Sequence, residues 1–162
     1  MNASFEAIQI PLPDDSNVIV GQSHFIKTVE DISEALVGTV PGIDYGIAFC
    51  EASGPCLIRT NGNREDLVGC AIEAAESVAA GHTFFVYIKN AYPINVTNQI
   101  ARCPEVVSIF AATANPLQVV VAATEQGRGI IGVIDGSSPR GVETDEDKRE
   151  RHALLRTIGY KF

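Results

Sequence analysis

The alternation of apolar and polar residues along the chain predicts a series of short strands interrupted by helices. Residues 84–88 are apolar at every position and rich in aromatic and β-branched side chains, which is typical of a strand covered on both faces. We interpret this segment as the central strand of a sheet. Further strands are expected at residues 5–10, 17–25, 43–52, 57–60, 106–112, 117–124 and 130–134.

Apolar residues recur at helical spacing in four of the intervening segments. Helices are predicted to begin near residues 28, 63, 95 and 144, with Thr28, Asn63, Asn95 and Thr144 as N-caps. The first, second and last helices are expected to stop at Gly38, Gly81 and Gly159, and Asn61-Gly62 to form a turn. Small residues of the second helix would allow a close approach to the sheet, and Leu154, Leu155 and Ile158 are expected to dock the last one.

Strands outnumber helices, and several strands follow one another directly along the chain. A strict alternation of strand and helix is therefore not expected. The predicted fold class is α/β of the α+β type, a mixed β-sheet with helices packed on it. With 162 residues, the chain is expected to form a single domain, 1–162, around one core.

Charge and apolar content exclude several classes of protein. A net charge of -8 and a pI near 4.8 argue against a general nucleic-acid binder, because phosphate repulsion would not be offset. No apolar run reaches membrane-spanning length, and the amino terminus lacks a basic region followed by an apolar segment. We expect a soluble, cytoplasmic protein with no nucleic-acid or membrane partner.

The four cysteines show no metal-binding or redox spacing. They lack a Cys-x-x-Cys pair and a nearby histidine cluster, so a zinc site is not expected. Four reduced, mostly buried thiols are the simplest interpretation. A bridge between Cys50 and Cys56, and with it a thiol-based redox role, is the alternative.

The first candidate chemistry lies where the strand at residues 17–25 leads into a helix. A helix amino terminus presents free backbone N–H groups and partial positive charge, which suit a phosphate. There, His24 could act as a base or accept a phosphoryl group, and Lys27 would neutralise the phosphate. Alternatively, His24 bonds a backbone carbonyl and Lys27 is a solvated surface charge. The residues at this junction are Gln22, Ser23, His24 and Lys27.

His82 is the competing histidine. It follows the carboxyl end of a predicted helix, whose partial negative charge favours imidazolium over a nucleophile. A straight strand from His82 to Asn90 spans about 26 Å, so these two residues cannot touch one phosphate within a subunit. His82 therefore belongs to another site, such as one across a subunit interface, or is structural.

Polar residues also follow the other predicted strands. Asparagine offers a donor and an acceptor for adenine or ribose hydroxyls, but it is also a common cap and turn residue. Asp135 could bind magnesium or a sugar hydroxyl, and Arg128 a phosphate, although turn chemistry explains Asp135-Gly136 equally well. The residues concerned are Asn90, Asn95, Asn115, Arg128 and Asp135.

Five blocks of the sequence resemble the adenosine-specific kinase family. They are GQSHFIKTVED at 21–31, GIAFCEASG at 46–54, IKNAYPINV at 88–96, FAATANP at 110–116 and GRGIIGVIDG at 127–136. The resemblance implies a small mixed α/β fold, a homo-oligomer, binding of adenosine or AMP, and a phosphoryl group handled through a histidine. Both His24 and His82 stand in segments similar to the family, and the physical reasoning favours His24.

The working hypothesis is therefore phosphoryl transfer involving adenosine. In it, Lys27 and the helix start grip the phosphate, His24 carries it or acts as base, and the three asparagines orient the nucleoside. Magnesium would be held by Glu51 or Asp135. The second hypothesis is a non-catalytic adenosine- or AMP-binding or sensing module, because no triphosphate-binding loop is recognisable and no pattern identifies the phosphoryl donor.

Overall fold

The structure, a computed structural model, describes residues 2–162. Strands and helices alternate irregularly along these residues, as the sequence predicts. No helix among them is long and apolar enough to cross a membrane. In chain order the elements are β1 (Ser4–Gln9), β2 (Asn17–Ser23), α1 (Thr28–Thr39), β3 (Asp44–Cys50), β4 (Ile58–Gly62), α2 (Glu65–Val78), β5 (Thr83–Lys89), α3 (Pro93–Ile100), β6 (Val106–Thr113), β7 (Leu117–Ala123), β8 (Arg128–Asp135) and α4 (Asp145–Thr157).

The strands form two sheets in which every neighbouring pair is antiparallel. A five-stranded sheet has the order β4-β3-β5-β2-β6, and a three-stranded sheet has the order β1-β7-β8. Strand β5 occupies the middle of the larger sheet, and its residues from Thr83 to Ile88 are buried, so the predicted central strand is confirmed. The α+β fold class, with helices packed on a sheet, is also confirmed.

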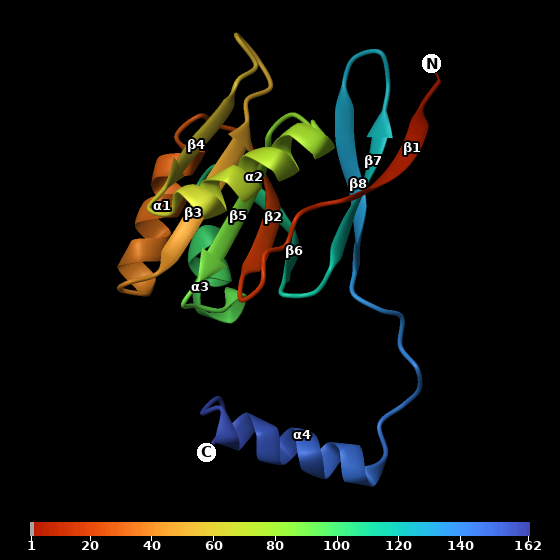
Figure 1. The fold of residues 1–162 in the computed structure, drawn as a ribbon. Helices are drawn as coiled ribbons and strands as arrows, with labels where there is room; N and C mark the ends of the chain where they lie inside the picture. Colours follow the sequence, from red (N-terminus) through yellow and green to blue (C-terminus); the bar gives the residue numbers. More distant parts are fainter. Residues whose placement is uncertain (1) are drawn as a thin grey trace.

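Two hydrophobic cores lie on the two faces of the five-stranded sheet (Figure 1). Helices α1 and α3 cover one face, where Ile32 and Leu36 pack with Phe84 and Val86. Helix α2 covers the other face together with the inner side of the three-stranded sheet. Both faces of β5 are therefore shielded from water, which explains its continuous apolar sequence.

Helix α4 lies apart from both sheets, at the end of an extended segment covering residues 136–144 (Figure 1). The Thr144 side chain accepts a hydrogen bond from Asp147 N, and Gly159 has a φ of +80° just after the helix; both predicted ends are confirmed. The expected docking is wrong, because α4 buries no residue and both Leu154 and Ile158 are exposed.

The other three predicted N-caps are displaced. Lys27, Arg64 and Tyr92 occupy the cap positions of α1, α2 and α3, and none of them makes a side-chain cap bond. Asn63 instead bonds the backbone of Tyr45 and Ile43 in the region of β3. Competition from a neighbouring strand thus removes a capping residue that local sequence favours.

Three predicted turns and stops also differ from the structure. Asn61 and Gly62 are not a turn but continue β4, where they pair with Ile47 and Gly46. Helix α1 continues through Gly38 to Thr39. Helix α2 ends at Ala79, which adopts the left-handed conformation expected for Gly81.

Candidate functional site

The pairing of β2 with β5 defines two ends of the five-stranded sheet. The two strands are antiparallel, so each end contains the start of one strand and the finish of the other. We call the end where β2 finishes and β5 begins the His24 end, and the opposite end the Asn90 end. Strand β2 has seven residues, so the two ends lie about 20 Å apart.

The site residues expected from the sequence divide between these two ends. The structure does not bring His24 and Lys27 together with Asn90 in one chain, because only parallel strands finish at the same edge. His24, like His82, is therefore too far from Asn90 for both residues to touch one phosphate within a subunit. At the Asn90 end lie Asn90, Asn95, Asn115 and Asp135, and at the His24 end lie Gln22, Ser23, His24, Lys27, His82 and Arg128.

A cavity of about 740 Å³ opens at the Asn90 end. Its volume lies within the range of about 300–1,000 Å³ common for small-molecule sites. Asp14 and Asp15 line it, and no lysine, arginine or histidine is among its described lining residues. The lining residues are Gln9, Ile10, Leu12, Pro13, Asp14, Asp15, Ser16, Asn17, Asn90, Ala91, Tyr92, Ala114 and Pro116.

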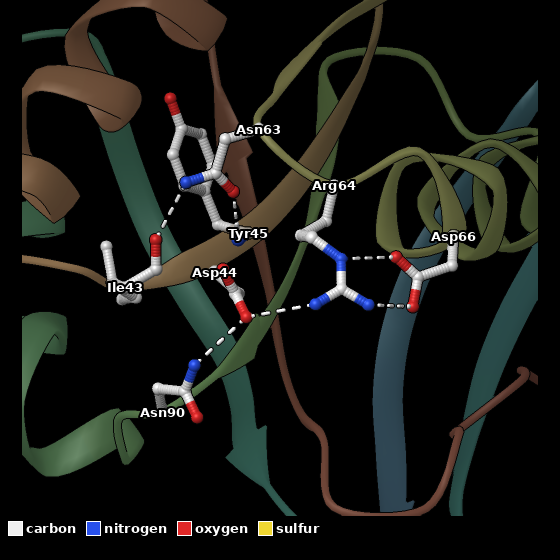
Figure 2. Close-up of polar contacts among 7 residues, drawn as sticks. All are labelled: Ile43, Asp44, Tyr45, Asn63, Arg64, Asp66 and Asn90. Carbon is white, nitrogen blue, oxygen red and sulfur yellow. Dashed lines mark hydrogen bonds and ion pairs between the residues drawn. The ribbon is translucent and has the colours of Figure 1, made fainter.

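Asn90 is held at the rim of this cavity by a polar network (Figure 2). Its Nδ2 donates to Asp44 Oδ2 at 2.9 Å, and Arg64 donates to the same oxygen at 3.1 Å. Arg64 also makes two 3.0 Å hydrogen bonds to Asp66 in the first turn of α2. The backbone of Asn90 is left-handed, with a φ of +60°. Asn90 therefore both ends β5 and presents its free Oδ1 near the cavity.

Asn95, Asn115 and Asp135 have local structural partners. Asn95 Oδ1 accepts a hydrogen bond from Tyr92 N at the start of α3. Asp135 Oδ1 accepts hydrogen bonds from Thr113 Oγ1 at 2.8 Å and Asn115 Nδ2 at 3.1 Å. These bonds support the structural interpretation of Asn95 and Asn115. The other oxygen of Asp135, Oδ2, takes part in none of these bonds.

A second cavity, of about 640 Å³, adjoins the first. Asn17, Tyr92 and Ala114 line both cavities, so they form the wall between them. Ile158 and Tyr160, which follow α4, line the second cavity. The carboxyl-terminal segment therefore contributes directly to the surface beside the first cavity.

At the His24 end, the expected phosphate site is occupied by protein contacts. Lys27 forms ion pairs with Asp31 and with Glu105, whose Oε2 lies 3.2 Å from Lys27 Nζ without hydrogen-bond geometry. The hydrogen bond to Asp31 contributes most to raising the pKa of Lys27, and Glu105 raises it further. Glu105 is fully buried. Lys27 is thus a charge partner of two carboxylates, not a free cation.

The two histidines differ in accessibility. The side chain of His24 is exposed, and its backbone N–H donates to Glu105 O at 3.0 Å. His82 is half-buried, and its ring stacks on Phe49 with 6.0 Å between ring centroids. His82 O accepts a hydrogen bond from Ser23 N at 2.8 Å, so the two histidine segments lie side by side. His24 is therefore the more exposed of the two histidines at this end, and His82 is partly exposed.

Gln22 and Ser23 are engaged within the fold. Gln22 is half-buried and pairs with Thr83 in the ladder between β2 and β5. Ser23 is fully buried, and its hydroxyl lies 2.5 Å from that of Thr28. These contacts connect the end of β2 to the first turn of α1.

Arg128 and Glu51 are also committed to protein partners. Arg128 bonds Glu6 at 2.7 Å and Ser77 O at 3.2 Å, which ties β8 to β1 and α2. Glu51 accepts hydrogen bonds from Leu57 N and from Arg59. The hydrogen bond from Leu57 N contributes most to lowering the pKa of this carboxyl, and Arg59 lowers it further. Desolvation by burial acts in the opposite direction. Glu51 is therefore a poor metal ligand, whereas Asp135 keeps one free oxygen.

The described residues offer no ready-made metal or thiol centre. Within residues 2–162, no three His, Cys, Asp or Glu side chains are grouped closely enough to hold a metal ion. Cys50 and Cys56 are not bonded to each other. Burial raises the pKa of the Cys50 thiol, which is the opposite of what a reactive cysteine requires.

Sequence reasoning missed three residues of the first cavity. Asn17 is buried and donates to Ala91 O at 3.2 Å, Tyr92 is 63% exposed, and Asp15 has a φ of +59°. In the sequence, the Tyr92-Pro93 pair indicated only a break between a strand and a helix. Asn17 begins a strand, and its proximity to Tyr92 depends on strand pairing that the local pattern does not reveal.

Comparisons with known proteins extend over nearly the whole chain. The family model described as adenosine specific kinase matches residues 8–161. The crystal structure of PH1918 protein from Pyrococcus horikoshii OT3 is similar to this chain, with 47% sequence identity and a TM-score of 0.95 over 99% of each chain. A search of curated proteins gives no match.

Proposed function

Because the chain belongs to the adenosine-specific kinase family, we propose that it binds adenosine or AMP and transfers a phosphoryl group to adenosine through a histidine. The family match over residues 8–161 carries this proposal. It includes every residue that lines the first cavity and both candidate histidines.

The nucleoside is assigned to the first cavity, at the Asn90 end. The exposed ring of Tyr92 offers a surface on which an adenine can stack. The amides of Asn17 and Asn90 offer donors and acceptors for the base or the ribose hydroxyls. This group of side chains supports nucleoside binding more directly than any other place in the described chain.

The charge of the cavity favours adenosine over AMP. Asp14 and Asp15 place two carboxylates at its wall, with no cationic side chain among the described lining residues. An uncharged nucleoside avoids the repulsion that a phosphate would meet there. AMP formed in this cavity would be released more readily than adenosine is.

His24 is the proposed phosphoryl carrier. Its exposed imidazole can accept the terminal phosphoryl group of a nucleoside triphosphate at one ring nitrogen, while the nucleoside diphosphate leaves with the electron pair of the broken P–O bond. The same group then passes to a hydroxyl of adenosine, which loses its proton. On this proposal His24 serves the cavity of another copy, because about 20 Å separates the two ends of the sheet within one chain.

Magnesium would neutralise the phosphates of a nucleoside triphosphate donor. Asp135 fits this role, because its Oδ2 is free and Thr113, its partner, lines the second cavity. Mg²⁺ commonly binds proteins through one or two carboxylates, with water and phosphate oxygens completing its shell. Glu51, whose two oxygens accept hydrogen bonds, is the weaker candidate.

A non-catalytic adenosine-binding module is the second candidate function. It is favoured by one observation: no histidine is among the described residues that line the cavity, so neither candidate phosphoryl-carrying imidazole lies in it. Such a module would bind adenosine with no need for His24.

The test combines labelled phosphate with intact mass. Protein is incubated with γ-labelled ATP, Mg²⁺ and adenosine, and we expect labelled AMP together with acid-labile phosphate on the protein. His24→Asn should abolish both signals, whereas the matched controls His82→Asn and His152→Asn should retain them.

Calorimetry separates the two candidate functions. Adenosine, AMP, ADP and ATP are titrated into the same preparations. Adenosine binding without label on AMP or protein would establish the binding module and reject phosphoryl transfer. Label retained in His24→Asn but lost in His82→Asn would reassign the carrier.

A further inference from the structure

Side-chain amides that line the first cavity share one orientation. Gln9 Nε2 donates to Leu117 O at 2.9 Å, and Asn17 Nδ2 donates to Ala91 O at 3.2 Å. A backbone carbonyl only accepts hydrogen bonds, so neither amide can be reversed without placing two oxygens against each other. In both side chains, the nitrogen therefore faces the protein and the oxygen is the atom left for a ligand.

Asn90 is fixed in the same way by a partner outside the cavity wall (Figure 2). Its Nδ2 donates to Asp44 Oδ2 at 2.9 Å, and Arg64 donates to the same oxygen at 3.1 Å. An ionised carboxylate only accepts hydrogen bonds, so the amide nitrogen must face Asp44. Figure 2 shows Oδ1 of Asn90 turned away from Asp44.

Other polar side chains of the wall are acceptors too. Asp14 and Asp15 are carboxylates, and the Ser16 hydroxyl donates its proton to Pro13 O. Together with the oxygens of the amides, these groups favour a ligand that donates hydrogen bonds. A site of this kind disfavours an analogue that brings an acceptor to the same place, because two acceptors then face each other.

The base of a bound nucleoside lies next to two of these acceptors. Tyr92, on which the base is proposed to stack, follows two residues after Asn90 and lines the cavity together with Asn17. The edge of a stacked base therefore faces the amide oxygens of Asn17 and Asn90. The 6-amino group of adenine donates hydrogen bonds, whereas a 6-oxo group such as that of guanine accepts them.

We propose that Asp44 is a specificity-determining residue, which holds Asn90 with its acceptor toward the ligand and makes the first cavity favour 6-amino over 6-oxo purine nucleosides. The inference rests on the proposed function, because it takes the nucleoside to be bound in this cavity. Asp44 is not among the lining residues, so it acts through Asn90.

Removal of the Asp44 carboxylate would leave a donor beside Asn90. Arg64 remains held by two hydrogen bonds to Asp66, and a guanidinium only donates. It would attract the oxygen of the Asn90 amide, and the amide would turn its nitrogen toward the ligand. Asp44→Asn should behave differently, because Arg64 would bind the new amide oxygen and keep an acceptor next to Asn90.

The test compares three nucleosides by calorimetry with the full-length protein. They are adenosine, inosine, which has a 6-oxo group, and purine riboside, which has no 6-substituent. Wild type should bind adenosine about fivefold more tightly than purine riboside, as expected for one hydrogen bond, and should bind inosine more weakly than either.

Asp44→Ala should bind adenosine about fivefold more weakly than wild type and inosine more tightly. Loss of folding cannot raise the affinity for inosine, so this gain separates a specificity role from a structural one. Asp44→Asn should keep the wild-type order of affinities. The matched control Glu65→Ala, which removes an exposed carboxylate from the first turn of α2, should keep it as well.

Asn90→Ala provides a variant that leaves Asp44 in place. Its preference for adenosine over inosine should shrink, and the double variant Asn90→Ala/Asp44→Ala should bind both nucleosides as Asn90→Ala does, because Asp44 acts through Asn90. Circular dichroism checks that each variant is folded. An effect of Asp44→Ala that persists in the Asn90→Ala background would overturn the inference.

Tyr92→Ala distinguishes failure of this inference from failure of the proposed function. Adenosine binding that Tyr92→Ala weakens, with equal affinity of wild type for inosine, would overturn the role of Asp44 and leave the proposed function standing. An adenosine preference unchanged in folded Asp44→Ala would have the same meaning. No adenosine binding, or binding that Tyr92→Ala leaves unchanged, would reject the inference together with the assignment of the nucleoside to this cavity.

Discussion

Asn90 illustrates how one side chain can have both a structural and a binding role. Its left-handed backbone ends β5, and its Nδ2 is fixed by Asp44. Its Oδ1 remains available beside the first cavity. The two roles are separable, because one depends on backbone conformation and the other on the side-chain amide.

Asn90→Ala and Asn90→Gly should separate these roles. Both variants lose the amide, so adenosine should bind about fivefold more weakly to each, as expected for one hydrogen bond. Alanine should destabilise the fold by about 1 kcal/mol more than glycine, because its Cβ opposes a positive φ. Calorimetry and urea unfolding measure the two effects. Unchanged adenosine affinity in both variants would remove Asn90 from the site.

Tyr87 provides a second test, through pH. Its ring is fully buried, and its hydroxyl donates to Pro11 O at 2.6 Å. Burial, followed by the charges of Cys70 and Glu73, raises the pKa of Tyr87. Its contribution to stability is therefore complete below the unfolded pKa of about 10 and declines above it, where only the unfolded chain loses the proton.

Tyr87→Phe should lower the free energy of unfolding by about 1 kcal/mol at pH 7, through loss of the hydrogen bond. The difference from wild type should shrink as pH rises above about 10. Urea unfolding at several pH values between 7 and 11 measures it. A difference that grows over that interval would contradict the expected direction of the pKa shift.

At the scale of elements, α2 lies in close contact with β3. The prediction that small residues let α2 approach the sheet is confirmed, since Ala71, Ala74 and Ala75 are fully buried. The sheet contributes Gly46, where an added Cβ would lie 2.2 Å from Val68 N. The contact therefore leaves room only for alanine side chains on α2 and for a glycine at residue 46 on β3.

Gly46→Ala should therefore force α2 away from the sheet and lower the free energy of unfolding by about 3 kcal/mol. Gly69→Ala is the matched control, because no atom lies within 4 Å of its added Cβ; it should stabilise α2 by about 0.5–1 kcal/mol. Thermal and urea unfolding measure both. Equal effects of the two substitutions would show that close packing at Gly46 is not limiting.

At the scale of the whole molecule, the five-stranded sheet and helix α4 should differ in local stability. Strand β5 lies in the middle of both cores, whereas α4 buries nothing within its own chain. Opening of β5 therefore requires global unfolding, and opening of α4 does not.

Hydrogen exchange should show this difference directly. Amides of β5 should exchange only through global unfolding, while those of α4 should exchange many-fold faster, because this helix buries no residue. Peptides of the two elements are compared in one sample by mass spectrometry, so that each serves as the control for the other. Protection of α4 equal to that of β5 would contradict this expectation.

The sequence alone determined the elements and little of their arrangement. The apolar pattern of residues 84–88 identified the central strand, and Thr144 and Gly159 marked the ends of α4, because burial on both faces and helix termination leave local signals. Caps such as Asn63 were misassigned, since a strand distant in sequence competes for the same side chain.

Only the tertiary structure decided which polar residues meet. Whether β2 and β5 run parallel or antiparallel depends on hydrogen bonds between segments far apart in the chain, and no local pattern records that choice. Antiparallel pairing placed His24 and Asn90 at opposite ends and created the cavity of Asn17 and Tyr92. The tertiary structure also decided that α4 has no buried residue.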